Sequence, residues 1–197
     1  MRILIVGAGV VGSAVAAALR DRHDLVIASV QTSPEKVDIA EPASIRALVS
    51  RIGRVDAVVS AAGRAAWKGL GDLSDADFDF SLRHKLMGQV NLFRLALDAM
   101  ADRGSFTFTA GYLSRNPAPG SSAVSLVNAA LEGFGRAAAL EAPRGIRVNV
   151  VSPPWITETL QKLGRPVTGG MPAAVVAQAY VRSVEGSDTG QVFDPKA

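Results

Sequence analysis

Three glycines near the start of the chain have a spacing that suits phosphate binding. Gly7, Gly9 and Gly12 follow the short apolar run Ile3–Val6 in the pattern G-x-G-x-x-G. Such glycines allow a tight turn, a close approach of the backbone to a pyrophosphate, and close packing of the next helix on the strand. The N-terminus of that helix offers free N–H groups to the phosphates. The predicted dinucleotide contacts are Gly7, Gly9, Val10, Val11 and Gly12. The alternative is a tight turn that binds nothing.

The end of the second apolar run bears on which dinucleotide is bound. An acid there would accept a hydrogen bond from the ribose 2′-hydroxyl of NAD and repel the 2′-phosphate of NADP. The segment Ala28–Ser33 contains no acid, and the next one along the chain is Glu35. Hydroxyl and amide groups in this segment are able to hold a phosphate, so the sequence favours NADP(H) over NAD(H). The predicted contacts are Ser29, Gln31 and Thr32.

Strand and helix patterns alternate along the chain, with short connections between them. The predicted strands are Ile3–Val6, Leu25–Val30, Val37–Ile39, Ala57–Ser60, Ser105–Thr109, Arg147–Val151 and Gln191–Phe193. The predicted helices are Val10–Arg20, Ala43–Ile52, Asp75–Met100, Ser121–Glu141 and Ala173–Val184. Such alternation indicates parallel strands joined by right-handed crossovers, with helices on both faces. We predict an α/β fold, in which residues 1–197 form a single doubly wound Rossmann-type domain with a mostly parallel, seven-stranded sheet.

Two loops rich in proline and glycine, residues 112–120 and 153–172, leave the carboxyl ends of predicted strands. Ligands of open α/β sheets bind beyond these ends. Both loops are therefore candidates for a substrate lid, and the alternative is that they are plain connections.

The stretch from Ser122 to Pro154 resembles a known enzyme family. It contains Ala129-Ala130-Leu131 with Phe134, then Gly145-Ile146-Arg147-Val148-Asn149, then Ser152-Pro153. These segments are similar to the Ala-Ala-Leu-x-x-Phe, Gly-Ile-Arg-Val-Asn and Ser-Pro-Gly segments of short-chain dehydrogenases/reductases. The similarity runs from about Arg2 to Phe193. The chain also resembles a compact subgroup of about 200 residues that lacks the usual active-site residues. The spacing of its first glycines, however, is the general dinucleotide form rather than the family's G-x-x-x-G-x-G.

The resemblance implies further cofactor contacts. Asp38-Ile39 resembles the strand whose aspartate contacts the adenine, and Ser60-Ala61-Ala62-Gly63 resembles the Asn-Asn-Ala-Gly turn along the adenine ribose. Pro153 and Ile156 match the family's Pro-Gly-x-Ile segment beside the nicotinamide, with Pro154 in place of the glycine. The contacts implied in this way are Asp38, Ile39, Ala61, Ala62, Gly63, Pro153 and Ile156.

The family's catalytic tetrad is absent from the chain. Gly111 occupies the position of the family's serine, Val124 that of its tyrosine, Asn128 that of its lysine and Lys85 that of its asparagine. Loss of a general acid costs a factor of about 10²–10⁴ in rate. The substitute catalytic residues that we predict are Tyr112, Lys85 and Asn128, and the predicted substrate pocket includes Thr109, Gly111 and Trp155. The alternatives are that Tyr112 and Trp155 only pack in the loops and that Lys85 lies on a helix surface.

Several other classes of function are disfavoured by the sequence. The chain has no cysteine, and its two histidines are isolated from one another, so no metal site is predicted. It has neither a G-x-S-x-G elbow nor a Gly-Lys-Ser/Thr phosphate loop. The net charge is only +3 and the basic residues form no run, so nucleic acid is not expected as a partner. No later segment is long and apolar enough to span a membrane. The apolar N-terminus resembles a secretion signal, but its glycines favour a buried strand and helix.

These observations predict an NADP(H)-dependent oxidoreductase that reduces a C=O or C=N bond with a non-standard proton donor. One alternative is a nucleotide-binding protein without redox turnover, acting as a sensor or partner subunit. Another is a non-redox reaction such as cyclisation in the same fold. The expected partner is a small-molecule substrate, and the expected location of the protein is the cytoplasm. The resemblance also implies a homodimer or homotetramer that packs through the two long helices, with the small residues Ala129, Ala130, Gly133, Ala137 and Ala138 allowing close approach.

Overall fold

A computed structural model describes residues 1–195, so the last two residues of the predicted domain 1–197 lie outside the described residues. The strands are β1 (Arg2–Val6), β2 (Asp24–Ser29), β3 (Glu35–Lys36), β4 (Val55–Ser60), β5 (Met100–Thr109), β6 (Arg147–Val151) and β7 (Val192–Phe193). The α-helices are α1 (Val10–Leu19), α2 (Pro42–Ile52), α3 (Asp75–Ser81), α4 (Gly88–Ala96), α5 (Ser122–Glu141), α6 (Thr157–Lys162) and α7 (Ala173–Glu185).

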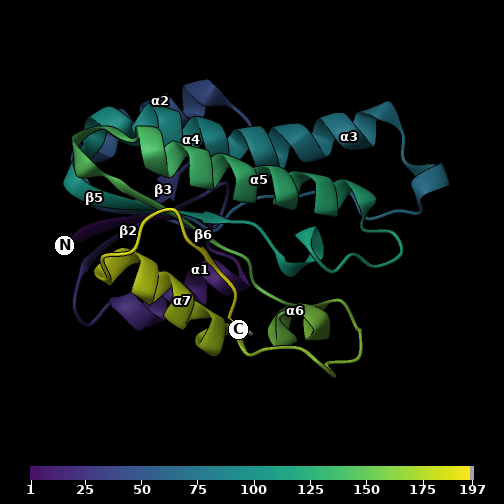
Figure 1. Cartoon of the computed structure of the whole chain (residues 1–197). Helices are drawn as coiled ribbons and strands as arrows, with labels where there is room; N and C mark the ends of the chain where they lie inside the picture. Colours follow the sequence, from purple (N-terminus) through teal and green to yellow (C-terminus); the bar gives the residue numbers. More distant parts are fainter. Residues whose placement is uncertain (196–197) are drawn as a thin grey trace.

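Within residues 1–195 the strands form one seven-stranded sheet in the order β3-β2-β1-β4-β5-β6-β7. Every pair of neighbouring strands is parallel. Helices α2, α4 and α5 cover one face of the sheet, and α1 and α7 cover the other (Figure 1). This arrangement is the predicted doubly wound α/β fold, which is thereby confirmed.

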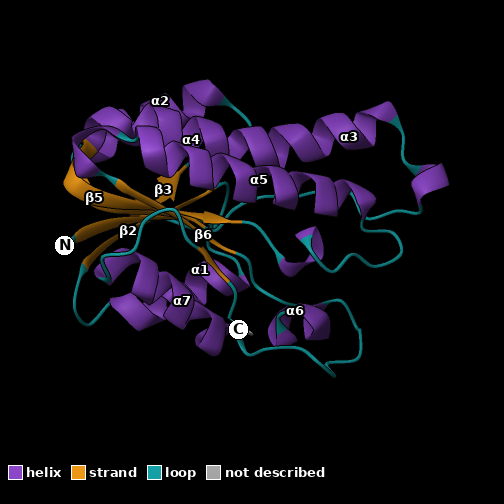
Figure 2. Ribbon diagram, in the orientation of Figure 1, coloured by secondary structure: helices purple, strands orange, loops and turns teal. Residues whose placement is uncertain are grey.

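The two helical layers follow from alternation along the buried strands (Figure 2). Successive side chains of a strand point to opposite faces. In β1, Ile3 and Ile5 belong to the apolar core that contains Tyr180 of α7. Leu4 and Val6 belong to the core on the opposite face, under α2, α4 and α5. All four side chains are at most 1 % exposed, as expected for a strand covered on both faces.

The strand order reverses between β1 and β4, which places two turns side by side. Gly7 follows β1 and donates its N–H to the carbonyl of Ala28 at 2.8 Å. Ala61 follows β4 and donates its N–H to the carbonyl of Val6 at 2.7 Å. Chains that leave such a switch point in opposite directions open a crevice at the carboxyl ends of the strands.

The third strand differs from the prediction. It consists of Glu35–Lys36, and the predicted strand residues Val37–Ile39 follow it. Val37 and Ile39 turn inward and are buried in the core under α2 and α4. The N–H of Asp38 is bonded to Ser44 of α2 at 3.0 Å. Apolar alternation over three residues therefore reflects an anchored connection and not a longer strand.

The predicted helix Asp75–Met100 is interrupted. Ser74 begins α3 with a capping box to Asp77, and the chain then widens into a π-helix over Leu82–Met87 before α4. Met100 already belongs to β5, five residues before the predicted start of that strand. At Gly88 this segment packs closely against the connection after β3, because a Cβ there would lie 2.8 Å from the Ile39 side chain. Wide helical turns of this kind recur at functional sites because they redirect side chains.

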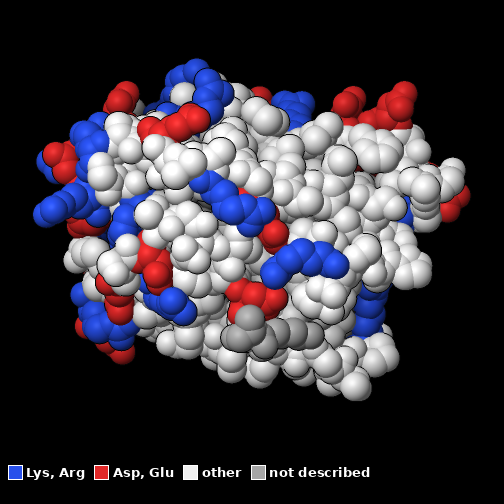
Figure 3. Space-filling view, in the orientation of Figure 1, with Lys and Arg blue, Asp and Glu red and all other residues white. Residues whose placement is uncertain are grey.

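Charge is dispersed on the face shown in Figure 3, where Lys and Arg side chains are interspersed with Asp and Glu. Among the described residues, no helix has both the length and the apolar character that a membrane crossing requires.

Candidate active site

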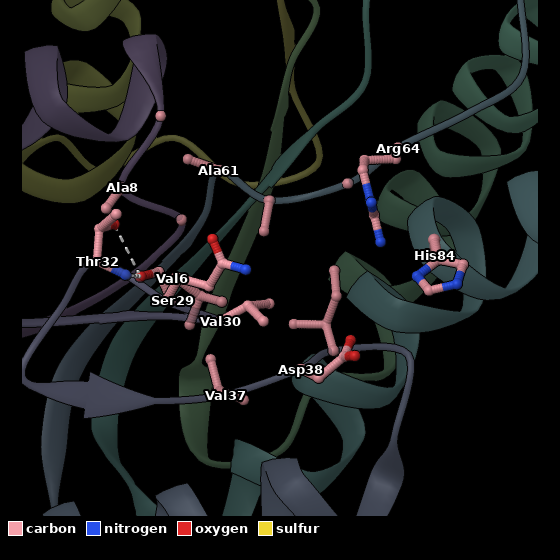
Figure 4. Close-up of a pocket in the computed structure, with 16 residues that line it drawn as sticks. Val6, Ala8, Ser29, Val30, Thr32, Val37, Asp38, Ala61, Arg64 and His84 are labelled. Atoms are coloured by element: carbon pink, nitrogen blue, oxygen red, sulfur yellow. Dashed lines mark hydrogen bonds between the residues drawn. The ribbon is translucent and has the colours of Figure 1, made fainter.

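A cleft of about 570 Å³ opens at the switch point between β1 and β4. In Figure 4, Ser29 and Thr32 lie on one side of this cleft, and Arg64 and His84 lie on the opposite side. The structure brings together most of the predicted cofactor contacts here. The predicted residues that line the cleft are Gly7, Gly9, Ser29, Gln31, Thr32, Asp38, Ile39, Ala61, Ala62 and Gly63.

The glycine turn has the shape of a phosphate cradle. Gly7 has a φ of +113°, and a Cβ there would lie 2.6 Å from the Ala61 backbone. A Cβ on Gly12 would lie 1.7 Å from the carbonyl oxygen of Gly7. At Gly9 an added Cβ would meet nothing within 4 Å, so the open side of the turn faces the cleft. The residues present therefore fit a dinucleotide pyrophosphate at the N-terminus of α1.

Three predicted contacts of the glycine motif do not line the cleft itself. Val10 begins α1 and lines a smaller neighbouring hollow, together with Lys162 of α6. Val11 packs against the core under α1 and α7, and Gly12 is buried against the turn. Their contribution is to hold the turn and the helix N-terminus, as the spacing of the motif requires.

The turn after β2 is fixed by its own polar groups. The Ser29 hydroxyl accepts the N–H groups of Thr32 at 3.1 Å and Ser33 at 3.0 Å. The Lys36 ammonium donates to the carbonyls of Gln31 at 2.6 Å and Ser33 at 2.7 Å. The turn thus presents hydroxyls and an amide to the cleft, with a lysine bound to its backbone.

Six residues that line the cleft were not predicted as contacts from the sequence. Arg64 follows the Ala61-Ala62-Gly63 turn, and its guanidinium lies 5.4 Å from the centre of the Phe80 ring. Its position directly after that turn was an available signal. The residues missed are Val6, Ala8, Val30, Val37, Arg64 and His84.

A second pocket of about 210 Å³ is lined almost entirely by apolar groups. His84 lines the nucleotide cleft and the next residue, Lys85, lines this pocket, so the two cavities adjoin. The structure gathers here all three predicted substitute catalytic residues, together with four other predicted site residues. These residues are Lys85, Tyr112, Asn128, Gly111, Pro153, Trp155 and Ile156. The pocket walls that were not predicted as site residues are Trp67, Ala110, Leu113, Val124, Pro154 and Thr159.

Thr109, which was predicted to contact the substrate, does not line this pocket. Its hydroxyl donates to the carbonyl of Ser60 at 2.6 Å and lies 2.7 Å from the Tyr180 hydroxyl, on the α7 side of the sheet. Gln89 holds the backbone of Thr109 through two bonds of 2.9 Å. The alternation of the strand turns this side chain away from the pocket. Thr109 therefore fixes the end of β5.

Lys85 is the cation of the pocket. It lies on the π-helix, and its ammonium donates to the carbonyl of Ala110 at 3.3 Å. Burial lowers its pKa from 10.5 to about 8, because an apolar surrounding disfavours the charged form. Across residues 1–195, no carboxylate forms an ion pair with it. A Cβ on Gly63 would lie 3.0 Å from the Lys85 Cγ, so that glycine leaves room for the lysine stem.

Asn128 and Gly111 depend on each other sterically. A Cβ on Gly111 would lie 2.8 Å from the Asn128 Nδ2. The amide therefore occupies the space that a side chain at 111 would need. Asn128 is 2 % exposed, and its Oδ1 is a buried acceptor without a hydrogen-bond partner among the described residues. An unpaired buried acceptor costs about 1–3 kcal/mol, so this oxygen is suited to a ligand hydroxyl.

Glu132, one turn after Asn128 on α5, ties together the two loops around the pocket. Its Oε1 accepts the hydroxyls of Ser114 at 2.6 Å and Ser152 at 2.7 Å. Arg115 lies 3.7 Å from the same oxygen and 3.2 Å from a carboxylate oxygen of Asp194. Ser114 follows β5 and Ser152 follows β6, so a single buried carboxylate fixes both loops. Glu132 carries no signal in the sequence, because its partners lie far away along the chain.

The described residues contain no group of three histidines, aspartates or glutamates placed to hold a metal ion. The polar side chains that line the pocket beside the nucleotide cleft include those of Lys85, Tyr112 and Asn128.

Comparison with known proteins identifies the family. A family profile described as enoyl-(acyl carrier protein) reductase matches residues 4–192. The chain belongs to the short-chain dehydrogenase/reductase family. The oxidoreductase UcpA of Escherichia coli K12 is 30 % identical over 150 residues, which is 72 % of this chain and 57 % of UcpA. The chain therefore spans little more than half the length of this relative.

Solved structures agree with this assignment to the short-chain dehydrogenases/reductases. The protein lin1944 of Listeria innocua superposes with a TM-score of 0.95 and 37 % identity, with 98 % of each chain covered. A small-chain dehydrogenase superposes with a TM-score of 0.87 and 26 % identity, covering 98 % of this chain and 95 % of the other. A small-chain dehydrogenase solved with NADPH has a TM-score of 0.86 and 24 % identity, with the same coverage, and is similar in fold.

Proposed function

We propose that this short-chain dehydrogenase/reductase uses NADP(H) to reduce a carbonyl group. In this proposal, the Lys85 ammonium donates a hydrogen bond, and then a proton, to the carbonyl oxygen. The observation that supports the proposal most is the junction of the two cavities. A cleft shaped for a dinucleotide adjoins an apolar pocket whose partly buried cation, Lys85, has no carboxylate partner among the described residues.

A bound nicotinamide dinucleotide supplies the hydride in this chemistry. The protein has to position the acceptor and stabilise the negative charge that develops on its oxygen. A Lys85 ammonium at that oxygen stabilises the charge and donates the proton, and its pKa of about 8 lies near neutral pH, where general acids work best. The apolar pocket walls strengthen this interaction by keeping water away.

The same cation bears on the choice between C=O and C=N. An iminium carries positive charge, and an unpaired ammonium beside it would disfavour its binding. A carbonyl oxygen gains negative charge during reduction and is stabilised by the ammonium. Of the two predicted bond types, Lys85 therefore favours C=O.

Asn128 has a supporting role in this proposal. Its buried Oδ1 has no partner within the described part of the chain and is available to a ribose hydroxyl of the cofactor. An asparagine there provides a hydrogen bond without adding a second positive charge near Lys85.

Tyr112 is the alternative proton donor. Its backbone N–H is bonded to the carbonyl of Pro153 at 2.9 Å, which fixes the loop that carries it, and its side chain lines the pocket. Matched variants separate the two donors: Lys85→Met keeps the length of the side chain without its charge, and Tyr112→Phe removes only the hydroxyl. We expect kcat/KM to fall by about 10²-fold or more in Lys85→Met and by less than about tenfold in Tyr112→Phe. The reverse order would assign proton donation to Tyr112.

The preference for NADP(H) follows from the turn after β2. Ser29, Gln31 and Thr32 line the cleft, and no carboxylate stands among residues 29–34 to repel a 2′-phosphate. We expect NADPH to bind at least about tenfold more tightly than NADH, since hydrogen bonds to a charged group contribute about 1.5–3 kcal/mol each. A titration that showed a clear preference for NADH would contradict this part of the proposal.

A nucleotide-binding protein without redox turnover is the second candidate. It is favoured by the replacement of all four tetrad residues, Gly111, Val124, Asn128 and Lys85. The deciding experiment is titration with NADPH, followed by a carbonyl and imine panel monitored at 340 nm, the usual NADPH absorbance, with each variant beside the wild type. Failure to bind NADPH would refute the oxidoreductase, and binding without any turnover would favour the second candidate. Turnover that consumes no NADPH would indicate a non-redox reaction such as cyclisation.

A further inference from the structure

The mouth of the apolar pocket carries an arginine held by two indoles. Trp67 lies in the loop after β4 and Trp155 in the loop after β6, and their ring centres are 5.4 Å apart. The guanidinium carbon of Arg165 lies 5.3 Å from the centre of Trp67 and 5.8 Å from that of Trp155. Stacking on aromatic faces orients a guanidinium and leaves its N–H groups free for an anion. The cation is thus placed at the pocket, although its side chain starts from a surface loop.

The charges around the pocket are not balanced by the protein. None of the residues that line it is an aspartate or a glutamate. Neither Lys85 nor Arg165 forms an ion pair within residues 1–195, whereas the nearby Arg115 contacts both Glu132 and Asp194. The floor and the mouth of one small cavity therefore each present a cation without a carboxylate. Lys85 is partly buried, and withdrawing a charge from water is costly unless an opposite charge compensates it. Arg165 is exposed, and no carboxylate of the described residues competes with a ligand anion for its N–H groups.

We propose that the substrate is a compact, flat carbonyl compound that carries a carboxylate. Its carbonyl oxygen points to Lys85, its apolar body lies along Trp155 and Val124, and its carboxylate is bound by Arg165. This assignment rests on the reductase function proposed above and names the class of substrate for the same site.

The size and shape of the cavity support a small, flat substrate. The cavity measures about 210 Å³. A closed apolar cavity of about 150 Å³ holds one benzene ring, so this pocket suits one ring, or a chain of similar volume, with its carbonyl. The indoles offer flat apolar faces, and the planar fork of an arginine matches a carboxylate bidentately. The cofactor phosphates are expected at Gly7–Val10, and none of these residues lines the pocket of the two indoles.

Binding can be tested without turnover, because the chain has two tryptophans and both line this pocket. Their fluorescence is titrated with phenylacetate and with its neutral isostere phenylacetamide. We expect the carboxylate to bind at least about tenfold more tightly, as a charge-assisted bond of about 1.5–3 kcal/mol predicts. Arg165→Gln should reduce this preference to less than about threefold. Arg46→Gln, an exposed arginine on α2, is the matched control and should leave the preference unchanged.

Equal affinity for the two compounds, no binding of either at millimolar concentration, or a preference that survives in Arg165→Gln would each overturn the proposal. Another contrary result would be a loss of NADPH affinity in Arg165→Gln with the carboxylate preference intact, because Arg165 would then serve the cofactor.

Turnover separates this inference from the proposed function. 4-Acetylbenzoate and its methyl ester, in which the ring separates the ketone from the carboxylate, are compared as substrates with NADPH, and we expect kcat/KM to be at least about tenfold higher for the acid in the wild type but not in Arg165→Gln. Reduction of the ester with no advantage for the acid would refute the anionic substrate and leave the reductase standing. If NADPH reduces no compound of the wider panel while phenylacetate still binds selectively, the reductase fails and the anion site stands.

Discussion

At the scale of single residues, two positions of the pocket depend on each other. Asn128 occupies the space beside Gly111, so a serine at 111 and this asparagine rotamer exclude each other. Lys85 is the only cation that lines the pocket within the described part of the chain. The positive charge of the pocket therefore comes from the π-helix Leu82–Met87 before α4, and α5 contributes the Asn128 amide.

The ionisation of Lys85 predicts how activity depends on pH. If the ammonium donates the proton, activity needs the charged form, which is lost as pH rises through its pKa of about 8. We expect kcat/KM with saturating NADPH to be level below pH of about 7 and to fall about tenfold per pH unit well above 8. The other ionisable side chains close to Lys85 are Tyr112, which lines the same pocket, and His84, the preceding residue. A pH profile in which Tyr112→Phe lost the alkaline limb, and Lys85→Met kept it, would contradict the assignment.

The same lysine should lower the stability of the fold. Its pKa falls from 10.5 in the unfolded chain to about 8 in the native state, so the native state holds its proton less tightly. The penalty is complete below pH 8 and is relieved as pH rises towards 10.5. Lys85→Met should therefore increase the free energy of unfolding at pH 7 by on the order of 2 kcal/mol, while activity falls. Urea denaturation measures this change, and a destabilised Lys85→Met would argue against an unpaired buried cation.

At the scale of elements, α5 organises the pocket from one face. Val124 and Asn128 line the pocket one turn apart, and Glu132 follows at the next turn and binds the loops after β5 and β6. Residues four apart lie on the same side of a helix, so one face of α5 both lines the pocket and fixes its rim. Hydrogen bonds from Ser114 and Ser152 to Glu132 thus hold the loops 112–120 and 153–172 near the points where they leave the sheet. The rest of each loop extends beyond these hydrogen bonds.

Removing the Glu132 carboxylate should loosen both loops. Glu132→Ala leaves the hydroxyls of Ser114 and Ser152 without their acceptor, and we expect a loss of about 2–4 kcal/mol in the free energy of unfolding. KM for substrate should rise more than the Kd for NADPH, because the cofactor is expected to touch these loops only at its nicotinamide end, while its remainder lies in a cleft that they do not line. Glu132→Gln, which keeps one acceptor, should recover part of both effects. Glu141→Ala, at the exposed end of the same helix, is the control. Equal losses in substrate and NADPH binding would show that Glu132 supports the whole fold and not the pocket.

At the scale of the whole molecule, the outer face of α5 carries apolar and small residues together with one exposed cation, Arg136. Leu126 is 48 % exposed and Leu140 is 89 % exposed at the two ends of this face. Between them Ala129, Gly133 and Ala137 are exposed, whereas Ala138, also predicted for the interface, is buried against the chain's own core. Small side chains allow a second helix to approach closely. Burial of the exposed leucines on association removes apolar surface from water and stabilises the complex. This face is where we propose that a homodimer forms.

Association should be sensitive to charge on this face. Ala137→Arg places a cation in the proposed interface, and we expect it to shift a dimer or tetramer towards the monomer at micromolar concentration. Ala47→Arg, on the exposed side of α2, is the matched control and should not change the mass. Light scattering after size-exclusion chromatography measures both. A monomeric wild-type protein would refute the proposed association.

The sequence by itself determined the fold of this protein, and most of the residues predicted for its site line one of the two cavities. Apolar runs such as Ile3–Val6 and the glycine turn at Gly7 act through local backbone geometry and burial pattern, which a sequence displays directly. The sequence missed the break in the long helix, the side of β5 on which Thr109 lies and the role of Glu132. These features depend on contacts between segments far apart in the chain, such as Thr109 with Tyr180 and Glu132 with Ser152.

Only the tertiary structure decided that Lys85 lies in an apolar pocket without a carboxylate, and that Arg165 lies over Trp67 and Trp155. From the sequence alone, Lys85 was equally compatible with a helix surface. The physical reason is that the pKa of a lysine and the partners of an arginine are set by the groups that surround them in space. Here those groups come from the loops after β4, β5 and β6. These loops meet only because the three strands lie side by side and parallel in the folded sheet.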